Sequence, residues 1–211
     1  MYIWSRLIGY LTWHRMRARL GVKQPPVTDA FAVAKLEYRA WPGDVDYSFH
    51  INNGRYATIM DMGRTDLMMR AGLWDSVRDN KWVPIVSAIA LRFRREVKLW
   101  QRFTLETRFV TWDDKLAIVE HVVRLRGGPR DGSVACAAFA RVGFYDPKAR
   151  SFVPTQKLMD MAGFDGAVPP LDLPEAAALL DIDAALRDVT DGKTREDVRR
   201  KRAQFAATPE I

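Results

Sequence analysis

The stretch that decides the fold of this 211-residue chain is Asp44-Val45-Asp46-Tyr47-Ser48-Phe49-His50-Ile51-Asn52-Asn53-Gly54-Arg55-Tyr56. It holds two carboxylates, a hydroxyl, an imidazole and two amides, and it leads directly into a helical pattern. A helix N-terminus presents unpaired backbone N–H groups and a partial positive charge. An acid and a histidine placed just before it can act on a carbonyl group while backbone N–H groups stabilise the developing oxyanion. The stretch therefore predicts a reactive site at the start of a helix.

The spacing of apolar residues after this stretch predicts a helix from Asn53 to about Arg70, ended by Ala71-Gly72. Glycine lowers helix propensity, so its presence inside this helix predicts a close approach to a sheet. One helix face is formed by Tyr56, Ile59, Met60, Gly63 and Leu67.

Strand patterns lie on both sides of the predicted helix. One precedes it, and four follow it as a meander. This order predicts an α+β fold in which an antiparallel sheet wraps over the helix. A short strand and helix are expected between residues 152 and 161, and a further helix between 173 and 189. The predicted strands are Phe31–Ala40, Ile85–Phe93, Phe103–Trp112, Leu116–Arg126 and Ser133–Tyr145.

The composition excludes several classes of protein. The net charge of +7 belongs to the two ends, because residues 1–24 contribute +5, residues 193–211 contribute +3, and the body between them carries −1. A nearly neutral body argues against a nucleic-acid-binding module. The single cysteine, Cys136, excludes an internal disulfide and a Cys-rich metal site, and its small apolar neighbours predict an inert core thiol.

Three regions are expected along the chain: an amphipathic basic helix over residues 1–24, one domain over 31–165, and a helical extension with a basic tail over 166–211. The first region has no apolar run long enough for a signal peptide or a membrane span. Its aromatic and basic residues suit a helix that lies on an anionic membrane surface. Docking on its own domain or on a partner subunit is the alternative. A cytoplasmic protein, with or without peripheral contact to the inner face of a membrane, is expected.

The run from Asp44 to Tyr56 resembles the active-site segment of hot-dog-fold acyl thioesterases. It is similar to the plant acyl-carrier-protein thioesterases and to the four-hydroxybenzoyl-CoA-thioesterase-like superfamily, in which an Asp and then His-x-Asn-Asn precede a long central helix. A second segment, Leu91-Arg92-Phe93-Arg94-Arg95-Glu96, resembles the strand that follows the helix in the plant enzymes. The resemblance covers roughly residues 31–165 and implies a hot-dog fold, with an antiparallel sheet wrapped around the long helix.

Carried over residue by residue, the resemblance assigns the catalytic carboxylate to Asp46, the motif histidine to His50 and a second acid to Glu96. Ser48 stands where the plant enzymes have an asparagine, so that position offers a hydroxyl instead of an amide. Val97 stands where they have a cysteine, which excludes a cysteine nucleophile there.

Glu96 has a second interpretation. Simple alternation along its strand places it on the side of Arg92 and Arg94, opposite the apolar side chains. Unless a bulge turns it, an ion pair is then the alternative to a catalytic role.

The resemblance implies hydrolysis of an acyl thioester to a free acid and a thiol. Asp46 would activate water, or attack the carbonyl carbon directly, and His50 would orient the reacting groups. Backbone N–H groups near the helix start would stabilise the oxyanion, and Asn52 or Asn53 would cap the helix. The expected substrate-binding residues are Ser48, Asn52, Asn53 and Gly54.

The implied substrate is an acyl-CoA or an acyl-carrier-protein thioester, in the context of fatty acid metabolism. The implied assembly is a homodimer or a dimer of dimers, with sites across the subunit interface. Neither a cofactor, a metal nor a nucleic-acid partner is expected. Basic residues available for CoA phosphates are Arg92, Arg94, Arg124, Arg126 and Arg130.

Two alternative functions stay open. Hot-dog hydratases and dehydratases share the fold but usually carry Asp-x-Asn-Pro-x-His, whereas this chain has Ser48 and Phe49 at the Asn and Pro positions. A non-catalytic acyl-CoA-binding or lipid-binding protein, associated with membranes through residues 1–24, is the alternative from another class. Release of free CoA from acyl-CoA distinguishes the enzyme from the binding protein.

Overall fold

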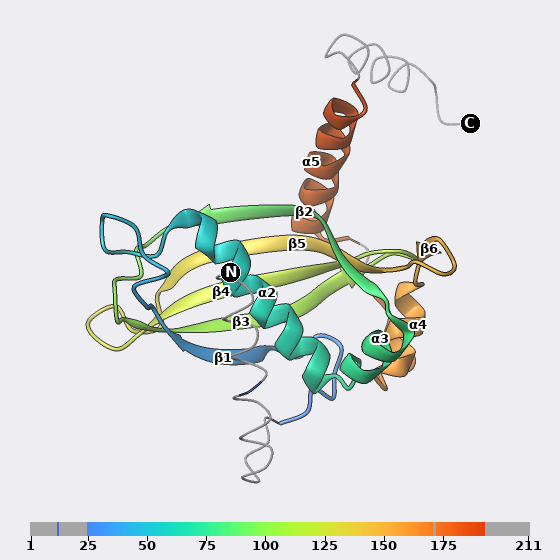
Figure 1. Ribbon diagram of the computed structural model, residues 1–211, viewed down its shortest axis with the longest axis horizontal. Helices are drawn as coiled ribbons and strands as arrows, with labels where there is room; N and C mark the ends of the chain where they lie inside the picture. The colour runs from blue at the N-terminus through green and yellow to red at the C-terminus, as the bar shows by residue number, and fades with distance from the viewer. Residues whose placement is uncertain (1–11, 13–24, 171, 193–211) are drawn as a thin grey trace. The chain divides into compact units, whose positions relative to one another are not determined.

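The structure, a computed structural model, describes residues 12, 25–170 and 172–192 (Figure 1). The chain divides into two compact units, residues 1–171 and 172–211. The amphipathic helix predicted over residues 1–24 and the basic tail after residue 192 lie outside the described residues, apart from position 12. The division into three regions stays a prediction.

Strands of the first unit form one antiparallel sheet in the order β1-β3-β4-β5-β2, and β6 pairs with β5. Nearly all of the predicted elements are present, with ends shifted by no more than three residues. The strands are β1 (Ala34–Arg39), β2 (Val83–Phe93), β3 (Arg102–Trp112), β4 (Ala117–Arg126), β5 (Val134–Asp146) and β6 (Ser151–Phe152). The helices are α2 (Asn53–Arg70), α3 (Trp74–Asn80), α4 (Thr155–Met161) and α5 (Pro174–Thr190).

The predicted four-strand meander is wrong in one respect. Strand β2 pairs with β5, for example Ala90 with Phe139, and only β3, β4 and β5 follow one another as neighbours. The reason is the connection 94–101, which is hydrogen-bonded to the loop before α2 and not folded into a hairpin. The Leu99 N–H donates to the Phe49 carbonyl and the Trp100 N–H to the Ala40 carbonyl, both at 2.9 Å. The connection thereby carries the chain from the β2 edge across to β3.

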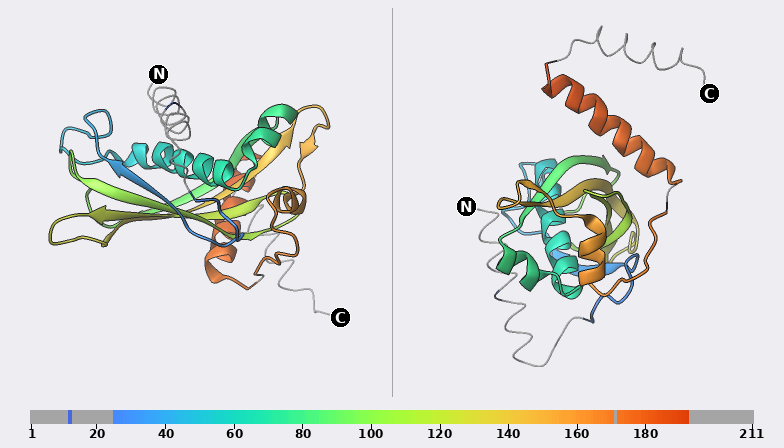
Figure 2. Two further views of the ribbon diagram at one scale, coloured as in Figure 1. Left: turned by 90° about the horizontal axis from the view of Figure 1, so that it is seen from below. Right: turned by 90° about the vertical axis from the view of Figure 1, so that its right-hand side faces the viewer.

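Helix α2 runs along one face of the sheet, and the sheet curves around it (Figures 1 and 2). Its buried Ile59 and Met60 belong to the same core cluster as Phe103 and Leu105 of β3. Complete burial of side chains of this size contributes roughly 1.5–3 kcal/mol each to stability. The sheet wrapped over a long helix confirms the predicted α+β, hot-dog arrangement.

Gly63 is the point of closest approach between α2 and the sheet. A Cβ atom at this position would lie 2.7 Å from Leu105 Cδ2 and would also collide with Thr107 Oγ1. The predicted close approach at Gly63 is confirmed.

Helix α3 is absent from the sequence prediction because a helix of seven residues shows little periodicity. It begins soon after Gly72, whose φ of 73° suits glycine and ends α2. None of the described helices combines the length and the apolar character needed to cross a bilayer.

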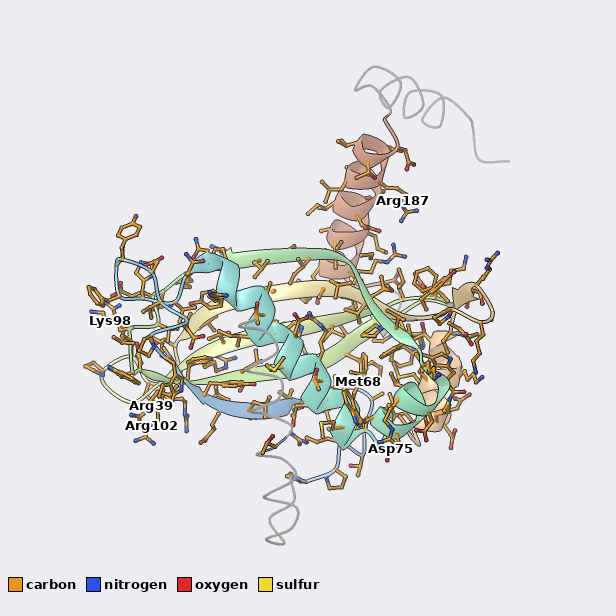
Figure 3. The ribbon with its side chains drawn as sticks, viewed as in Figure 1. Arg39, Met68, Asp75, Lys98, Arg102 and Arg187 are labelled. Carbon is orange, nitrogen blue, oxygen red and sulfur yellow. The ribbon has the colours of Figure 1, made fainter. Side chains whose placement is uncertain are left out.

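One end of the sheet brings together segments that are distant in sequence. There β1, β2 and β4 end, β3 and β5 begin, and α2 starts after its loop. We call this end the site end and define it as residues 39–55, 92–102 and 124–133. Arg39, Lys98 and Arg102 mark it in Figure 3.

Candidate functional site

Asp44 closes the loop that precedes α2. Its buried carboxylate accepts a hydrogen bond from the Trp41 N–H at 2.8 Å, and its carbonyl accepts one from the Asn52 N–H at 2.9 Å. Burial raises the pKa of the Asp44 carboxyl above its ordinary value, although the Trp41 hydrogen bond and the charge of Arg55 act in the opposite direction. Asp44 therefore supports the loop from inside.

Asp46 lies in a tight turn within this loop. Its N–H donates to the His50 carbonyl at 3.1 Å, and its carbonyl accepts from the Phe49 N–H at 3.0 Å. One carboxylate oxygen accepts from the Ser48 N–H at 2.9 Å, and the other lies 3.5 Å from Asn52 Nδ2. The side chain is 21% exposed. The carboxylate is thus directed toward the helix start and not into bulk solvent.

His50 is a close neighbour of this carboxylate. Its Nδ1 lies 3.9 Å from Asp46 Oδ1 and 3.3 Å from the Ile51 carbonyl oxygen. Because a carbonyl oxygen only accepts, a hydrogen bond there requires the proton on Nδ1. In the neutral ring, Nε2 is then left as an acceptor for a reacting group.

Asn52 caps α2 and also connects Asp46 to the helix. Its side-chain oxygen accepts from the Gly54 N–H at 2.9 Å. The cap engages the Gly54 N–H, and the role of Gly54 in substrate binding stays a prediction. The Asn53 N–H has no hydrogen-bond acceptor among residues 25–170. The first turn contains no acidic residue, which leaves the helix terminus positive.

The connection 94–101 forms the wall beside this loop. His50 and Lys98 form an antiparallel bridge, and the Ile51 N–H donates to the Val97 carbonyl at 2.9 Å. Val97, at the position of the plant cysteine, is completely buried. This wall of the site was not predictable from local patterns, because its hydrogen bonds join residues about fifty positions apart.

Glu96 is brought to the same wall, but its side chain faces solvent. Strand β2 ends at Phe93, so the alternation assumed for Glu96 does not extend to it. Its carboxylate lies 3.3 Å from Lys98 Nζ in an exposed ion pair. This pairing matches the alternative interpretation of Glu96, and its catalytic role stays a prediction.

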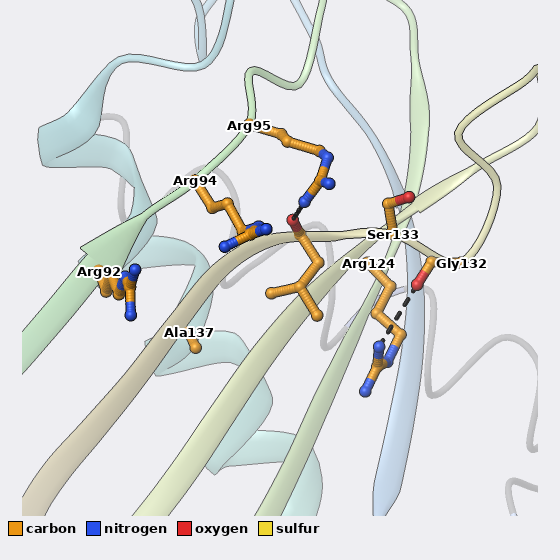
Figure 4. A pocket seen from close by; sticks show the side chains of 8 residues that line it. Arg92, Arg94, Arg95, Arg124, Gly132, Ser133 and Ala137 are labelled. Atoms are coloured by element: carbon orange, nitrogen blue, oxygen red, sulfur yellow. Dashed lines mark hydrogen bonds between the residues drawn. The ribbon is translucent and has the colours of Figure 1, made fainter.

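A hollow of about 500 Å³ at the site end is lined by arginines from β2, the connection 94–101 and β4, and by small residues of β5 and the turn before it (Figure 4). Arg124 donates to Glu106 at 2.8 Å, and Arg95 donates to the Val134 carbonyl at 3.1 Å. In the part of the chain that the structure describes, no acidic side chain pairs with Arg92 or Arg94. Three of the five predicted phosphate-binding arginines meet here, whereas Arg126 lies 3.9 Å from Asp131 and Arg130 is not part of the lining. The lining residues are Arg92, Arg94, Arg95, Arg124, Gly132, Ser133, Val134 and Ala137.

Metal binding has no support in the described residues. Within 25–170 and 172–192, no three His, Cys, Asp or Glu side chains gather as a metal site requires. The buried His121 is instead held by protein groups, with Nε2 2.9 Å from Arg64 and Nδ1 3.1 Å from Thr107 Oγ1.

Comparison with known proteins gives both a family and a fold. Protein THEM6 of Xenopus laevis is 32% identical over 112 residues, which are 51% of this chain and 54% of that protein. The chain spans about half the length of the curated relatives it matches.

Two solved structures share the fold. YbaW, a probable thioesterase from Escherichia coli, is 20% identical with a TM-score of 0.54, over 60% of this chain and 94% of that one. The hypothetical protein SAV2348 from Staphylococcus aureus, solved in complex with CoA, is 12% identical with a TM-score of 0.57, over 69% of this chain and 91% of that one.

The family model described as the thioesterase-like superfamily matches residues 40–179. This match includes the loop before α2, the helix itself and all strands from β2 to β6. It extends over well more than half of the chain, and the chain therefore belongs to the thioesterase-like superfamily.

Proposed function

We propose that this protein hydrolyses acyl thioesters to a free acid and a thiol. The observation that carries the proposal is the position of the Asp46 carboxylate, 3.5 Å from the Asn52 side chain that caps α2 and beside His50. Membership of the thioesterase-like superfamily supports the proposal. In addition, a carboxylate at a positive helix terminus is suited to promote attack on a carbonyl group.

In the proposed reaction, Asp46 takes a proton from a water molecule that attacks the thioester carbonyl carbon. The carbonyl oxygen becomes negative and is stabilised by the Asn53 N–H and the helix dipole; one such donor contributes roughly 3–4 kcal/mol. The C–S bond then breaks, the leaving thiolate takes the proton from the Asp46 carboxyl, and the acid remains. His50 Nε2 accepts a hydrogen bond from the attacking water. Direct attack by Asp46, with an anhydride intermediate, is the alternative first step.

An acyl-CoA is the favoured substrate. The hollow presents the guanidinium groups of Arg92, Arg94, Arg95 and Arg124. A guanidinium group can donate two parallel hydrogen bonds to the oxygens of one phosphate. CoA carries several phosphate groups. The phosphopantetheine arm of a carrier protein carries only one phosphate, and the carrier protein itself supplies the rest of the contact surface. The solved complex of SAV2348 with CoA supports this choice. An acyl-carrier-protein thioester remains the alternative.

A homodimer is the proposed assembly. Strand β2 is an edge of the sheet, with eleven residues and no partner on one side within the described residues. Val83, Val86 and Phe93 on it are exposed. A long apolar edge strand readily pairs with another chain, and pairing with a second β2 would cover it.

The experiment that tests the function measures free CoA release from a panel of acyl-CoAs that differ in chain length and head group. Turnover of at least one member is expected. If none is turned over by well-folded protein, although calorimetry shows that an acyl-CoA binds, the protein is a non-catalytic acyl-CoA-binding protein.

A further inference from the structure

Besides Phe93 at the end of β2, four large aromatic side chains in the loops of the site end are exposed. The exposed fractions are 55% for Trp41, 93% for Tyr47, 67% for Phe49 and 47% for Trp100. They come from two loops that hydrogen-bond to each other, and the rings of Trp41 and Trp100 meet edge to face at 5.2 Å. We call these four residues the aromatic rim. Its exposure is costly in water, which indicates a function for the surface.

The backbone directs two members of the rim outward. Phe49 has a φ of 57° and Trp100 a φ of 64°, in the left-handed region that bulky residues rarely adopt. Hydrogen bonds fix both conformations, since the Phe49 carbonyl accepts from Leu99 and the Trp100 N–H donates to Ala40. Strain of this kind persists where surrounding structure enforces it, often at sites of binding.

The same end is strongly basic. Residues 39–55, 92–102 and 124–133 contain ten Lys and Arg against four Asp and Glu, a net charge of +6. The rest of residues 25–170 contains eleven against thirteen, a net charge of −2. Residues 25–170 are therefore electrically polarised, with their positive end at the candidate site, and that end attracts an anionic partner.

A row of three arginines on adjacent strands contributes to the excess of positive charge at the site end. Arg39 of β1 pairs across the sheet with Arg102 of β3, and Arg102 pairs with Arg126 of β4. Like charges directly opposite one another destabilise a sheet. Arg39 and Arg102 are exposed, and no carboxylate pairs with either among residues 25–170. An external anion would relieve this repulsion.

We infer that the site end docks on an anionic lipid surface, with the aromatic rim at the level of the headgroups. Trp and Tyr have an apolar body and a polar tip, and they concentrate at the interface between lipid and water. Arg39 and Arg102 lie at the same end, where lipid phosphates would neutralise them (Figure 3). An acidic protein would satisfy the charges but would not require the exposed rings.

The docking surface is distinct from residues 1–24 and does not depend on thioester hydrolysis. If the proposed function also holds, docking places Asp46 beside the surface in which long-chain acyl thioesters reside. The two proposals can therefore fail separately.

The test is sedimentation of the full chain with vesicles of phosphatidylcholine alone or mixed with phosphatidylserine. One variant removes charge, Arg39→Gln with Arg102→Gln, and a second removes rings, Tyr47→Ser with Phe49→Asn. Asn tolerates the positive φ at position 49. The control, Lys115→Gln with Lys148→Gln, removes two exposed charges at the opposite end of the sheet.

Wild type is expected to bind the mixed vesicles more tightly than the neutral ones. The affinity of the charge variant for mixed vesicles should fall roughly tenfold or more, because each basic residue near an anionic membrane surface contributes to the free energy of binding. The ring variant should lose binding to a similar extent, and the control should match wild type. Turnover of a soluble short-chain acyl-CoA should persist in the charge variant, and vesicle binding should persist in Asp46→Asn.

Several results would overturn the inference. One is that wild type does not bind the mixed vesicles. Another is that wild type binds both vesicle types equally. A third is that the charge variant and the ring variant both bind as tightly as wild type. Light scattering provides a further test. If the oligomeric state of the ring variant differs from that of wild type, the aromatic rim is a contact between subunits and not a lipid-binding surface.

Discussion

The side chain of Asn52 connects the Asp46 carboxylate to α2, because its nitrogen lies 3.5 Å from Asp46 Oδ2 while its oxygen caps the helix. One amide therefore serves both the stability of the helix and the position of the proposed base. The two roles can be separated by substitution.

Asn52→Asp keeps a good capping residue but places a second carboxylate beside Asp46. Stability should stay within a few tenths of a kcal/mol of wild type, whereas kcat/KM should fall roughly tenfold because the amide contact to Asp46 is lost and a second negative charge opposes the developing oxyanion. Asn52→Ala should instead lose about 1 kcal/mol of stability through the missing cap. Urea unfolding and steady-state kinetics measure both. Equal activity in Asn52→Asp and wild type would show that the amide does not position Asp46.

Gly63→Ala should destabilise the protein by about 1–3 kcal/mol, because the added Cβ would lie 2.7 Å from Leu105 Cδ2. Helix propensity alone predicts the opposite sign, a gain of about 1 kcal/mol. Thermal or chemical unfolding decides between the two signs. A stabilised variant would mean that the helix and β3 separate easily.

His121 predicts a pH dependence of stability. Burial and the charge of Arg64 hold the pKa of His121 well below its ordinary value of 6.5. As the pH falls below about 6.5, the unfolded chain takes up a proton at this residue and the folded chain does not. The free energy of unfolding should therefore decrease on acidification, by at most about 1.4 kcal/mol per pH unit. Unfolding of His121→Gln between pH 7 and pH 5 should show a shallower decline, and parallel curves would contradict the assignment.

Cys136 should be unreactive in the folded protein. It is completely buried, and burial raises the pKa of its thiol to about 12. A thiol reagent at pH 8 should label nothing in native protein and one group after denaturation. Labelling of the native state would reveal local opening of β5, and it would also interfere with detection of released CoA.

Much of the fold was predictable because its signals are local. The Asn52 cap, the periodic apolar face and Gly72 fix α2, whose bounds were predicted without error. Gly63 predicted the close contact between α2 and the sheet. The pairing of β2 with β5 was not predictable, because it depends on hydrogen bonds between the connection 94–101 and a loop about fifty residues away.

The candidate site was predictable in part for the same reason. Asp46, His50 and Asn52 fall within seven residues, and the structure brings their side chains together. The use of the Gly54 N–H by the cap and the outward position of Glu96 depend on geometry that residue identity does not carry. The aromatic rim has a sequence signal, four aromatic residues in two short polar segments, but only exposure gives it meaning.

The most direct measurement of the central claim is free CoA release by Asp46→Asn, compared with wild type on the acyl-CoA that wild type prefers. Asp165→Asn, at an exposed position outside the site end, is the matched control. The account predicts a fall in kcat of about a hundredfold or more for Asp46→Asn, with an unchanged fold and an unaffected control. Equal rates for Asp46→Asn and wild type would contradict it.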